Sequence, residues 1–186
     1  MDALLPVFVA ILLGETGGRV QAVAHRLSET FSQTRAILAA LALATFISLT
    51  IGAVGGAVVA NLINFQARTL LAGLALIFAG APMLLSRKPV AAIGGTKPFG
   101  TSLFHFARAQ LGDASQFIVF GFAARADMPG FASAGGLAAV IISTLPPLLL
   151  RDEWPGSVPL GLLRRIAAVL LMIAGARMAL GAMQLI

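Results

Sequence analysis

Long apolar stretches alternate with short polar segments along this chain. Six of the stretches approach the roughly 20 residues that an α-helix needs to cross a bilayer. The segments between them hold Ser, Asn, Gly and Pro together with most of the charged residues, a composition typical of turns. The pattern therefore predicts an all-α, polytopic membrane protein with six transmembrane helices. The expected spans are 3–25, 36–62, 67–86, 100–124, 130–150 and 160–184.

The stretches repeat at an offset of 95 residues. Gly17 and Gln21 recur as Gly112 and Gln116. The second and third spans of each half add further matches at the same offset: Ala44, Ile47, Ser48, Leu76, Ala79, Gly80, Ala81 and Met83 recur as Ala139, Ile142, Ser143, Leu171, Ala174, Gly175, Ala176 and Met178. Because three helices are an odd number, the second copy must enter the membrane from the opposite side. We therefore expect two inverted three-helix repeats, a known transporter device.

Within this architecture we expect one transmembrane domain over residues 1–186. Repeat 1 covers about 1–86, a connecting loop covers 87–99, and repeat 2 covers about 100–186. Pro147 matches Gly52 within the second span of each half, so both copies weaken that helix at one position. A hinge and a static kink both fit this match.

Composition narrows the class of protein. The chain is 59% hydrophobic and 11% charged, with a mean hydropathy of +0.96, whereas soluble domains carry about 25% charged residues. The net charge of +6 comes from basic residues that lie mainly in the short connections, so it indicates control of topology rather than nucleic-acid binding. The chain has no cysteine, which excludes disulfides and thiolate metal sites. We interpret the first stretch as a retained helix rather than a cleaved signal peptide.

The basic residues also predict the orientation. Eight of the thirteen lie in the first, third and fifth connections, and only Arg68 and Arg125 lie in the second and fourth. Cytoplasmic loops carry the excess of Lys and Arg. The odd connections are therefore expected in the cytoplasm and both termini outside it, in a membrane such as the bacterial inner membrane.

Two carboxylates fall inside the expected spans, one in each repeat. Glu15 lies among Gly14, Gly17 and Gly18, and Asp113 lies beside Gly112. An ionisable group at this depth costs at least roughly 2.5–3.5 kcal/mol, so it marks a functional site by default. The pseudo-two-fold axis should bring both acids together near the middle of the membrane. Such a pair can bind a divalent cation or protons, and competition for the same oxygens is the physical basis of antiport.

Neutral oxygens near the acids complete the candidate site. We expect Gln110, Ser115, Gln116 and Gln21 to join Glu15 and Asp113 as ligands. Hard oxygen donors favour Mn²⁺, Ca²⁺ or Mg²⁺ over Zn²⁺ and copper. Structural alternatives stay open: Arg19 lies four residues after Glu15, one helical turn away, and Ser and Gln also join helices by hydrogen bonds. His105 and Arg108 lie in the same span as Asp113. Two interpretations stay open for each: His105 relays protons or is a packed side chain, and Arg108 neutralises Asp113 or extends to the membrane interface.

In the first and fourth of six helices, the two strings resemble the paired Glu-x-Gly-Asp-(Lys/Arg)-(Ser/Thr) motifs of a known family. It comprises the small Ca²⁺/Mn²⁺:H⁺ antiporters, also called uncharacterised protein family 0016, which includes the Golgi transmembrane protein 165 group and bacterial manganese exporters. The resemblance extends over the whole chain in size, span number, motif position and duplication. It implies exchange of a divalent cation for protons, with the motif acids as ligands.

Each motif copy departs from the family pattern. In the first, Glu15, Gly17 and Arg19 agree, whereas Gly18 replaces Asp and Val20 replaces Ser/Thr. In the second, Gly112, Asp113 and Ser115 agree, whereas Gln110 replaces Glu and Ala114 replaces Lys/Arg. The paired family motifs hold four acids and two bases, and this chain keeps two acids and one base of these. Because Ca²⁺-type affinity follows ligand charge, a weaker divalent site is expected.

The leading prediction is a secondary transporter that exchanges Mn²⁺ or Ca²⁺ for protons, with no resident cofactor. Its partners would be the lipid bilayer, the cation and protons, without nucleic acid, and a homo-oligomer is compatible with the sequence. The alternatives are an exporter of a small organic solute, similar to lysine exporters, and a non-transporting membrane subunit. We expect no enzyme, since the sequence has no nucleophile–base pair, His-rich cluster or phosphate-binding loop.

Overall fold

The computed structural model describes residues 3–85, 90–154 and 159–185, and these form helices without any β-strand. The all-α prediction is therefore confirmed. The first half contains α1 (Leu4–Gly14), α2 (Arg19–Thr30), α3 (Thr34–Ala60), α4 (Phe65–Gly80) and the 3₁₀ turn η1 (Ala81–Leu84). The second half contains α5 (Pro98–Gln110), α6 (Ala114–Arg125), α7 (Pro129–Leu150), the 3₁₀ turn η2 (Arg151–Glu153) and α9 (Leu160–Ala182).

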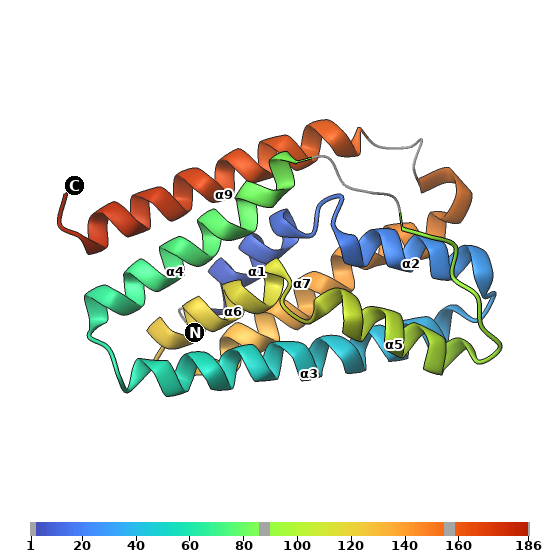
Figure 1. Ribbon diagram of the computed structural model, residues 1–186, viewed down its shortest axis with the longest axis horizontal. Helices are drawn as coiled ribbons and strands as arrows, with labels where there is room; N and C mark the ends of the chain where they lie inside the picture. Colours follow the sequence, from blue (N-terminus) through green and yellow to red (C-terminus); the bar gives the residue numbers. More distant parts are fainter. Residues whose placement is uncertain (1–2, 86–89, 155–158, 186) are drawn as a thin grey trace.

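The helix starts follow the repeat. The starts of α2 and α6, of α3 and α7, and of α4 and α9 are each 95 residues apart. In Figure 1, α1 and α2 run away from the end of the molecule that holds the C-terminus, whereas α5 and α6 run toward it. The two halves therefore enter the bundle in opposite directions, as an inverted repeat requires.

The first span of each half is broken. We expected continuous helices over 3–25 and 100–124, but α1 ends at Gly14 before α2 begins, and α5 ends at Gln110 before α6 begins. A helix rises about 1.5 Å per residue, so pieces of 11 to 13 residues are too short to cross a core of about 30 Å alone. Both breaks lie near the middle of the long axis of the molecule (Figure 1).

The expected count of six spans is not confirmed. Four helices in the described part of the chain are long and apolar enough to cross a membrane, and the count rises to five if α1 and α2, bent by 63°, form one broken span. The pair α5 and α6 is not among them. The four single spans are Thr34–Ala60, Phe65–Leu84, Pro129–Leu150 and Leu160–Ala182.

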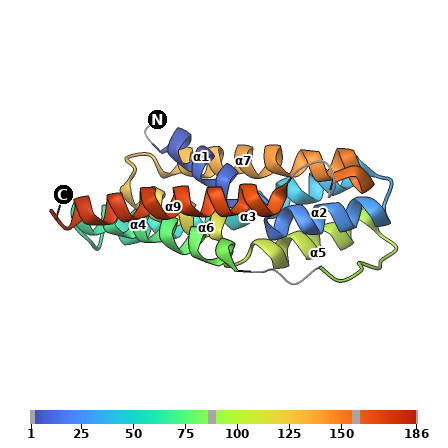
Figure 2. The same ribbon diagram turned by 90° about the horizontal axis from the view of Figure 1, so that it is seen from above.

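Glycine allows the third helices of the two repeats to pack closely. α4 and α9 lie side by side in both views (Figures 1 and 2). A Cβ atom on Gly73 would lie 2.7 Å from the carbonyl oxygen of Gly175, and one on Gly175 would lie 2.5 Å from that of Gly73. Each glycine therefore leaves room for the backbone of the other helix.

The outer surface suits lipid rather than water. Large apolar side chains are exposed along the long helices, such as Phe46 on α3, Phe78 on α4 and Ile173 on α9. Soluble monomers seldom expose large contiguous apolar patches. The surface thus agrees with a multi-pass membrane protein.

The connections divide between the two ends of the molecule. The first connection and residues 90–97 of the third lie at the end where α2 finishes, and those after α3 and α6 lie at the opposite end (Figure 1). This arrangement matches the predicted separation of basic residues. Arg87 and Lys88, which contribute to that prediction, lie outside the described residues, as does the proposed boundary between repeat 1 and the loop.

Candidate functional site

The two breaks have the same backbone geometry. Gly17 has φ +63° and Gly112 has φ +73°, values that glycine adopts without steric cost. In the first break, the N–H of Gly18 donates to the carbonyl of Glu15 at 2.7 Å; in the second, the N–H of Asp113 donates to the carbonyl of Gln110 at 3.2 Å. The motif glycines thus form turns at both breaks. These turns bend the chain but do not reverse its direction.

Two glutamines hold these turns in place. The side-chain oxygen of Gln21 accepts a hydrogen bond from the N–H of Gly17 at 3.0 Å, and that of Gln116 accepts one from Gly112 at 2.8 Å. Each side-chain nitrogen then donates across the repeats: Gln21 to the carbonyl of Ser143 at 2.8 Å, and Gln116 to that of Ser48 at 3.2 Å. The two predicted ligands therefore connect each break to the second span of the other repeat.

The residues four positions after the acceptor serines explain this contact. Pro147 has no N–H, so the carbonyl of Ser143 lacks its usual partner within α7 and is available to Gln21. In the other repeat, Gly52 leaves room for α6, because a Cβ there would lie 2.8 Å from the carbonyl oxygen of Gln116. Pro147 in α7 and Gly52 in α3 occupy matching positions of the two repeats. Both thus allow the same contact with a glutamine, Pro147 by leaving a carbonyl available and Gly52 by leaving space.

The motifs meet at Glu15 and Ser115. The hydroxyl of Ser115, in the first turn of α6, donates to a carboxylate oxygen of Glu15 at 2.5 Å, and both side chains are buried. These residues are 100 positions apart in the chain. The two motifs therefore meet at this pair, and the approach of Glu15 to Asp113 stays a prediction.

Glu15 also explains the glycine at position 18. A Cβ on Gly18 would lie 2.7 Å from both the carbonyl oxygen and a carboxylate oxygen of Glu15. The Glu15 carboxylate thus lies where a side chain at position 18 would begin, and the family pattern has an aspartate at that position. Gln110, the counterpart of Glu15, instead donates from its side-chain nitrogen to the hydroxyl of Thr45 on α3 at 2.7 Å.

An open cavity of about 800 Å³ lies beside the breaks, along the first turns of α2 and the last turns of α5. It lies between α2, α5 and the segment 90–93, and Glu15 is not among its lining residues. Arg19, Asp113, His105 and Arg108 line it, together with Gly17. The break places Glu15 and Arg19 in different elements, so the one-turn spacing that suggested their ion pair does not apply. Arg19 instead shares this cavity with Asp113.

The described side chains form no ready-made metal cluster at the breaks. Among the described residues, no group of three or more His, Asp or Glu side chains could hold a metal ion. A cation at the breaks would therefore need hydroxyl, amide or carbonyl oxygens beside the two acids. Two neighbours of the site were not predicted from the sequence. Thr45 accepts a hydrogen bond from Gln110, and the Cδ atom of Arg164 would lie 3.4 Å from a Cβ on Gly17.

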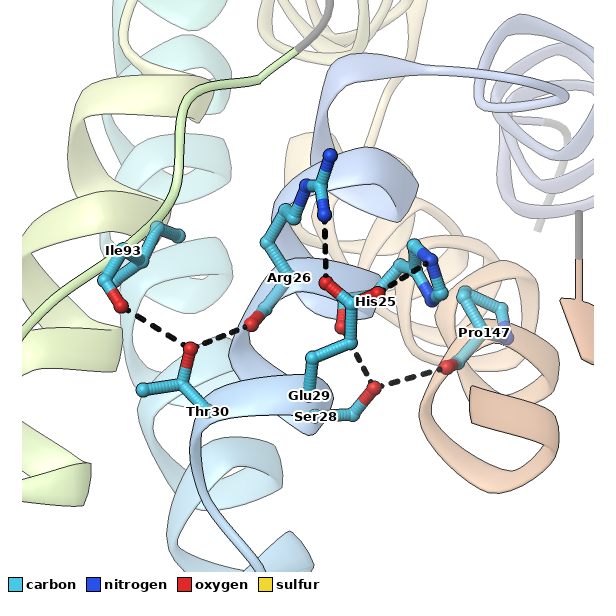
Figure 3. A network of polar contacts seen from close by, with 7 residues as sticks. All are labelled: His25, Arg26, Ser28, Glu29, Thr30, Ile93 and Pro147. Carbon is cyan, nitrogen blue, oxygen red and sulfur yellow. Dashed lines mark hydrogen bonds and ion pairs between the residues drawn. The ribbon is translucent and has the colours of Figure 1, made fainter. Parts of the chain in front are cut away.

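The far end of α2 is held by a separate polar network, drawn in Figure 3. Ser28 donates to the carbonyl of Pro147 at 3.3 Å, and Thr30 donates to that of Ile93 at 3.1 Å. Glu29 accepts from Arg26 at 2.9 Å and lies 3.4 Å from His25. These contacts connect α2 to α7 and to the loop that covers the cavity.

A family model described as "Divalent cation/proton antiporter GDT1" matches residues 3–90 and 98–185 of this chain. The two matched segments correspond to the two halves of the fold and agree with an inverted repeat. No curated protein and no solved structure matches the chain.

Proposed function

The chain belongs to the GDT1 family of divalent cation/proton antiporters, and on this premise we propose that it exchanges Mn²⁺ or Ca²⁺ for protons where its two helix breaks meet. The observation that carries the proposal is the buried hydrogen bond from Ser115 to Glu15 at 2.5 Å. It joins the two motifs across the repeats around a carboxylate. Burying a carboxylate in such a position costs free energy, and an ionisable group at membrane depth therefore indicates a functional site.

Five of the six predicted ligands divide into two groups in this proposal. Glu15, Asp113 and Ser115 supply the oxygens that contact the cation. Gln21 and Gln116 hold the turns, since each already bonds a glycine N–H and a serine carbonyl. Gln110 belongs to neither group, because its amide donates to Thr45. Oxygen donors of this kind suit hard divalent cations.

Coupling follows from competition for the same oxygens. A protonated carboxyl group is a poor ligand, so the cation binds as the proton leaves. The open cavity between α2, α5 and the segment 90–93 gives access to the breaks from one side. Protonation of the carboxylates from that side would release the cation. Loss of these protons would let a cation bind again.

The test is cation-dependent proton flux in vesicles that contain the purified protein and an internal pH-sensitive dye. We expect Glu15→Gln to abolish the flux driven by Mn²⁺ or Ca²⁺, and Asp113→Asn to reduce it. Glu29→Gln and Asp127→Asn are the matched controls, because they make the same changes away from the breaks. Equal flux in wild type, Glu15→Gln and Asp113→Asn would contradict the proposal and would favour the organic-solute or non-transporting alternative.

The orientation stays part of the proposal: odd connections in the cytoplasm and both termini outside. The chain has no cysteine, so single cysteines report accessibility without background. We expect a membrane-impermeant maleimide applied to intact cells to label Asn61→Cys in the second connection and to spare Gln33→Cys in the first. The reverse labelling would reverse the orientation.

A further inference from the structure

The two breaks share one backbone framework but carry different side chains. Three hydrogen bonds of the first break have counterparts 95 residues later in the second, including both contacts of Gln21 and Gln116. The side chains differ at six of the eight positions 14–21, and at four of these six the side chain of at least one copy hydrogen-bonds across the repeats or lines the cavity. Glu15, Gly18, Arg19 and Val20 of the first break correspond to Gln110, Asp113, Ala114 and Ser115 of the second.

Each of these positions keeps a charged or hydroxyl side chain in one copy only. Contacts across the axis show which groups belong together. Ser115 donates to Glu15, and the equivalent contact would join Val20 to Gln110, where valine has no donor. Arg19 and Asp113 line one cavity, and their equivalents are Ala114 and Gly18, which carry no functional group. Neither the Glu15–Ser115 contact nor the Arg19–Asp113 pairing can therefore form again in the symmetry-related half-site.

The other half-site has different contacts. The amide of Gln110 donates to Thr45 at 2.7 Å, and the carbonyl of Gln110 accepts from Ser48 at 3.2 Å. Gln110, Thr45 and Ser48 are all buried, and both partners lie on the 27-residue helix α3. A neutral amide fixed in this way exchanges no proton. It attaches the end of α5 to α3.

Resting on the function proposed above, we propose that this chain keeps one working half-site and has converted the other into a structural latch. Glu15 is the carboxylate that exchanges a proton for the cation, and the hydroxyl of Ser115 positions it. When the cation binds, the carboxyl proton leaves to solvent, and the Ser115 hydroxyl oxygen turns toward the cation. Gln110 and Thr45 keep the second break attached to α3 and contribute no proton.

The test counts the protons released per Mn²⁺ bound, by isothermal titration of the purified full-length protein in buffers of different ionisation enthalpy. We expect the double variant Val20→Ser/Gln110→Glu to release up to about one more proton per Mn²⁺ than wild type, because it rebuilds the second half-site. Ser115→Ala should weaken Mn²⁺ binding about tenfold, the effect of one lost hydrogen bond to a charged group. Thr45→Val should lower the unfolding temperature and weaken Mn²⁺ binding less than Ser115→Ala does.

An unchanged proton count in a folded double variant would overturn the half-site proposal and leave the proposed function in place. A loss of affinity in Thr45→Val as large as in Ser115→Ala would do the same. If the double variant does not fold, the comparison of Thr45→Val with Ser115→Ala decides. A wild-type protein that binds neither Mn²⁺ nor Ca²⁺ would overturn both proposals.

Discussion

The break between α1 and α2 and the break between α5 and α6 are built on the same turn, with a left-handed glycine and a glutamine that reaches across to the other repeat. They differ in what fills the turn. The first break holds a buried carboxylate against Ser115, whereas the second holds a buried amide against Thr45. The comparison separates two requirements of a duplicated transporter. The backbone framework must exist twice for the fold, but the chemistry needs to exist only once.

The surroundings of the breaks differ in a related way. α6 packs on both α3 and α4, whereas α2 packs on α7 and, with α5, forms a wall of the cavity. Figure 2 shows α2 and α5 together at one end of the molecule. A cavity lined by Arg19 and Asp113 lies at the breaks between these two helices. Glu15, by contrast, is buried and does not line this cavity.

The glutamines provide the strongest test of the shared framework. Gln21→Ala and Gln116→Ala each remove two hydrogen bonds and leave a glycine N–H and a serine carbonyl without them. We expect each to lower the free energy of unfolding by roughly 2–3 kcal/mol, with the larger loss at the more buried Gln21. Unfolding in detergent measures the change, with the exposed Gln66→Ala as the control. A loss at only one of the two sites would show that the breaks are not equivalent.

The turn glycines should give a smaller effect that differs between the breaks. Gly17→Ala and Gly112→Ala both place a Cβ at positive φ, which costs about 1–2 kcal/mol. Gly17→Ala should cost more, because its Cβ lies 3.4 Å from Arg164, whereas the space at Gly112 is open. Thermal unfolding compares the two with Gly161→Ala, an open helical position in α9 where alanine should be neutral or stabilising. An equal loss at Gly161 would show that the effect does not come from the turn.

The network at the far end of α2 should give the smallest effect. Glu29→Gln weakens contacts with His25 and Arg26, but the Glu29 side chain is 31% exposed and the Arg26 side chain 41%. Exposed ion pairs contribute about 0.2–1 kcal/mol, and salt screens them. We expect a loss at the low end of this range that disappears in high salt. A loss as large as that of Gln21→Ala would place the functional anchor of α2 at its end rather than at the break.

Much of the fold could be predicted from the sequence. The length of the apolar stretches and the offset of 95 residues predicted the helical membrane fold and its repeat, and the helix starts follow that offset. The glycines near Glu15 and Asp113 indicated close backbone approach, but the spans there were predicted as continuous. Hydropathy does not distinguish one 23-residue helix from two short ones, because both bury the same apolar side chains.

Two neighbours of the site could not be predicted by comparing the two repeats. Thr45 corresponds to Val140, so comparing the two copies gives it no weight. Arg164 was counted among the charges of a connection, whereas it lies on α9 beside Gly17. Both were missed because their importance comes from a neighbour distant in sequence rather than from their own repeat.

The sequence by itself determined that this is a duplicated helical membrane protein with one acid in each copy of a motif. Apolar length and chain duplication are local properties, and a linear reading can measure them. Only the tertiary structure decided that Ser115 contacts Glu15, that Gln110 contacts Thr45, and that Gln21 and Gln116 hold the turns. Those pairs depend on where helices cross, and the crossing is set by backbone contacts at positions such as Gly52, where the packing of the whole bundle decides which side chains meet.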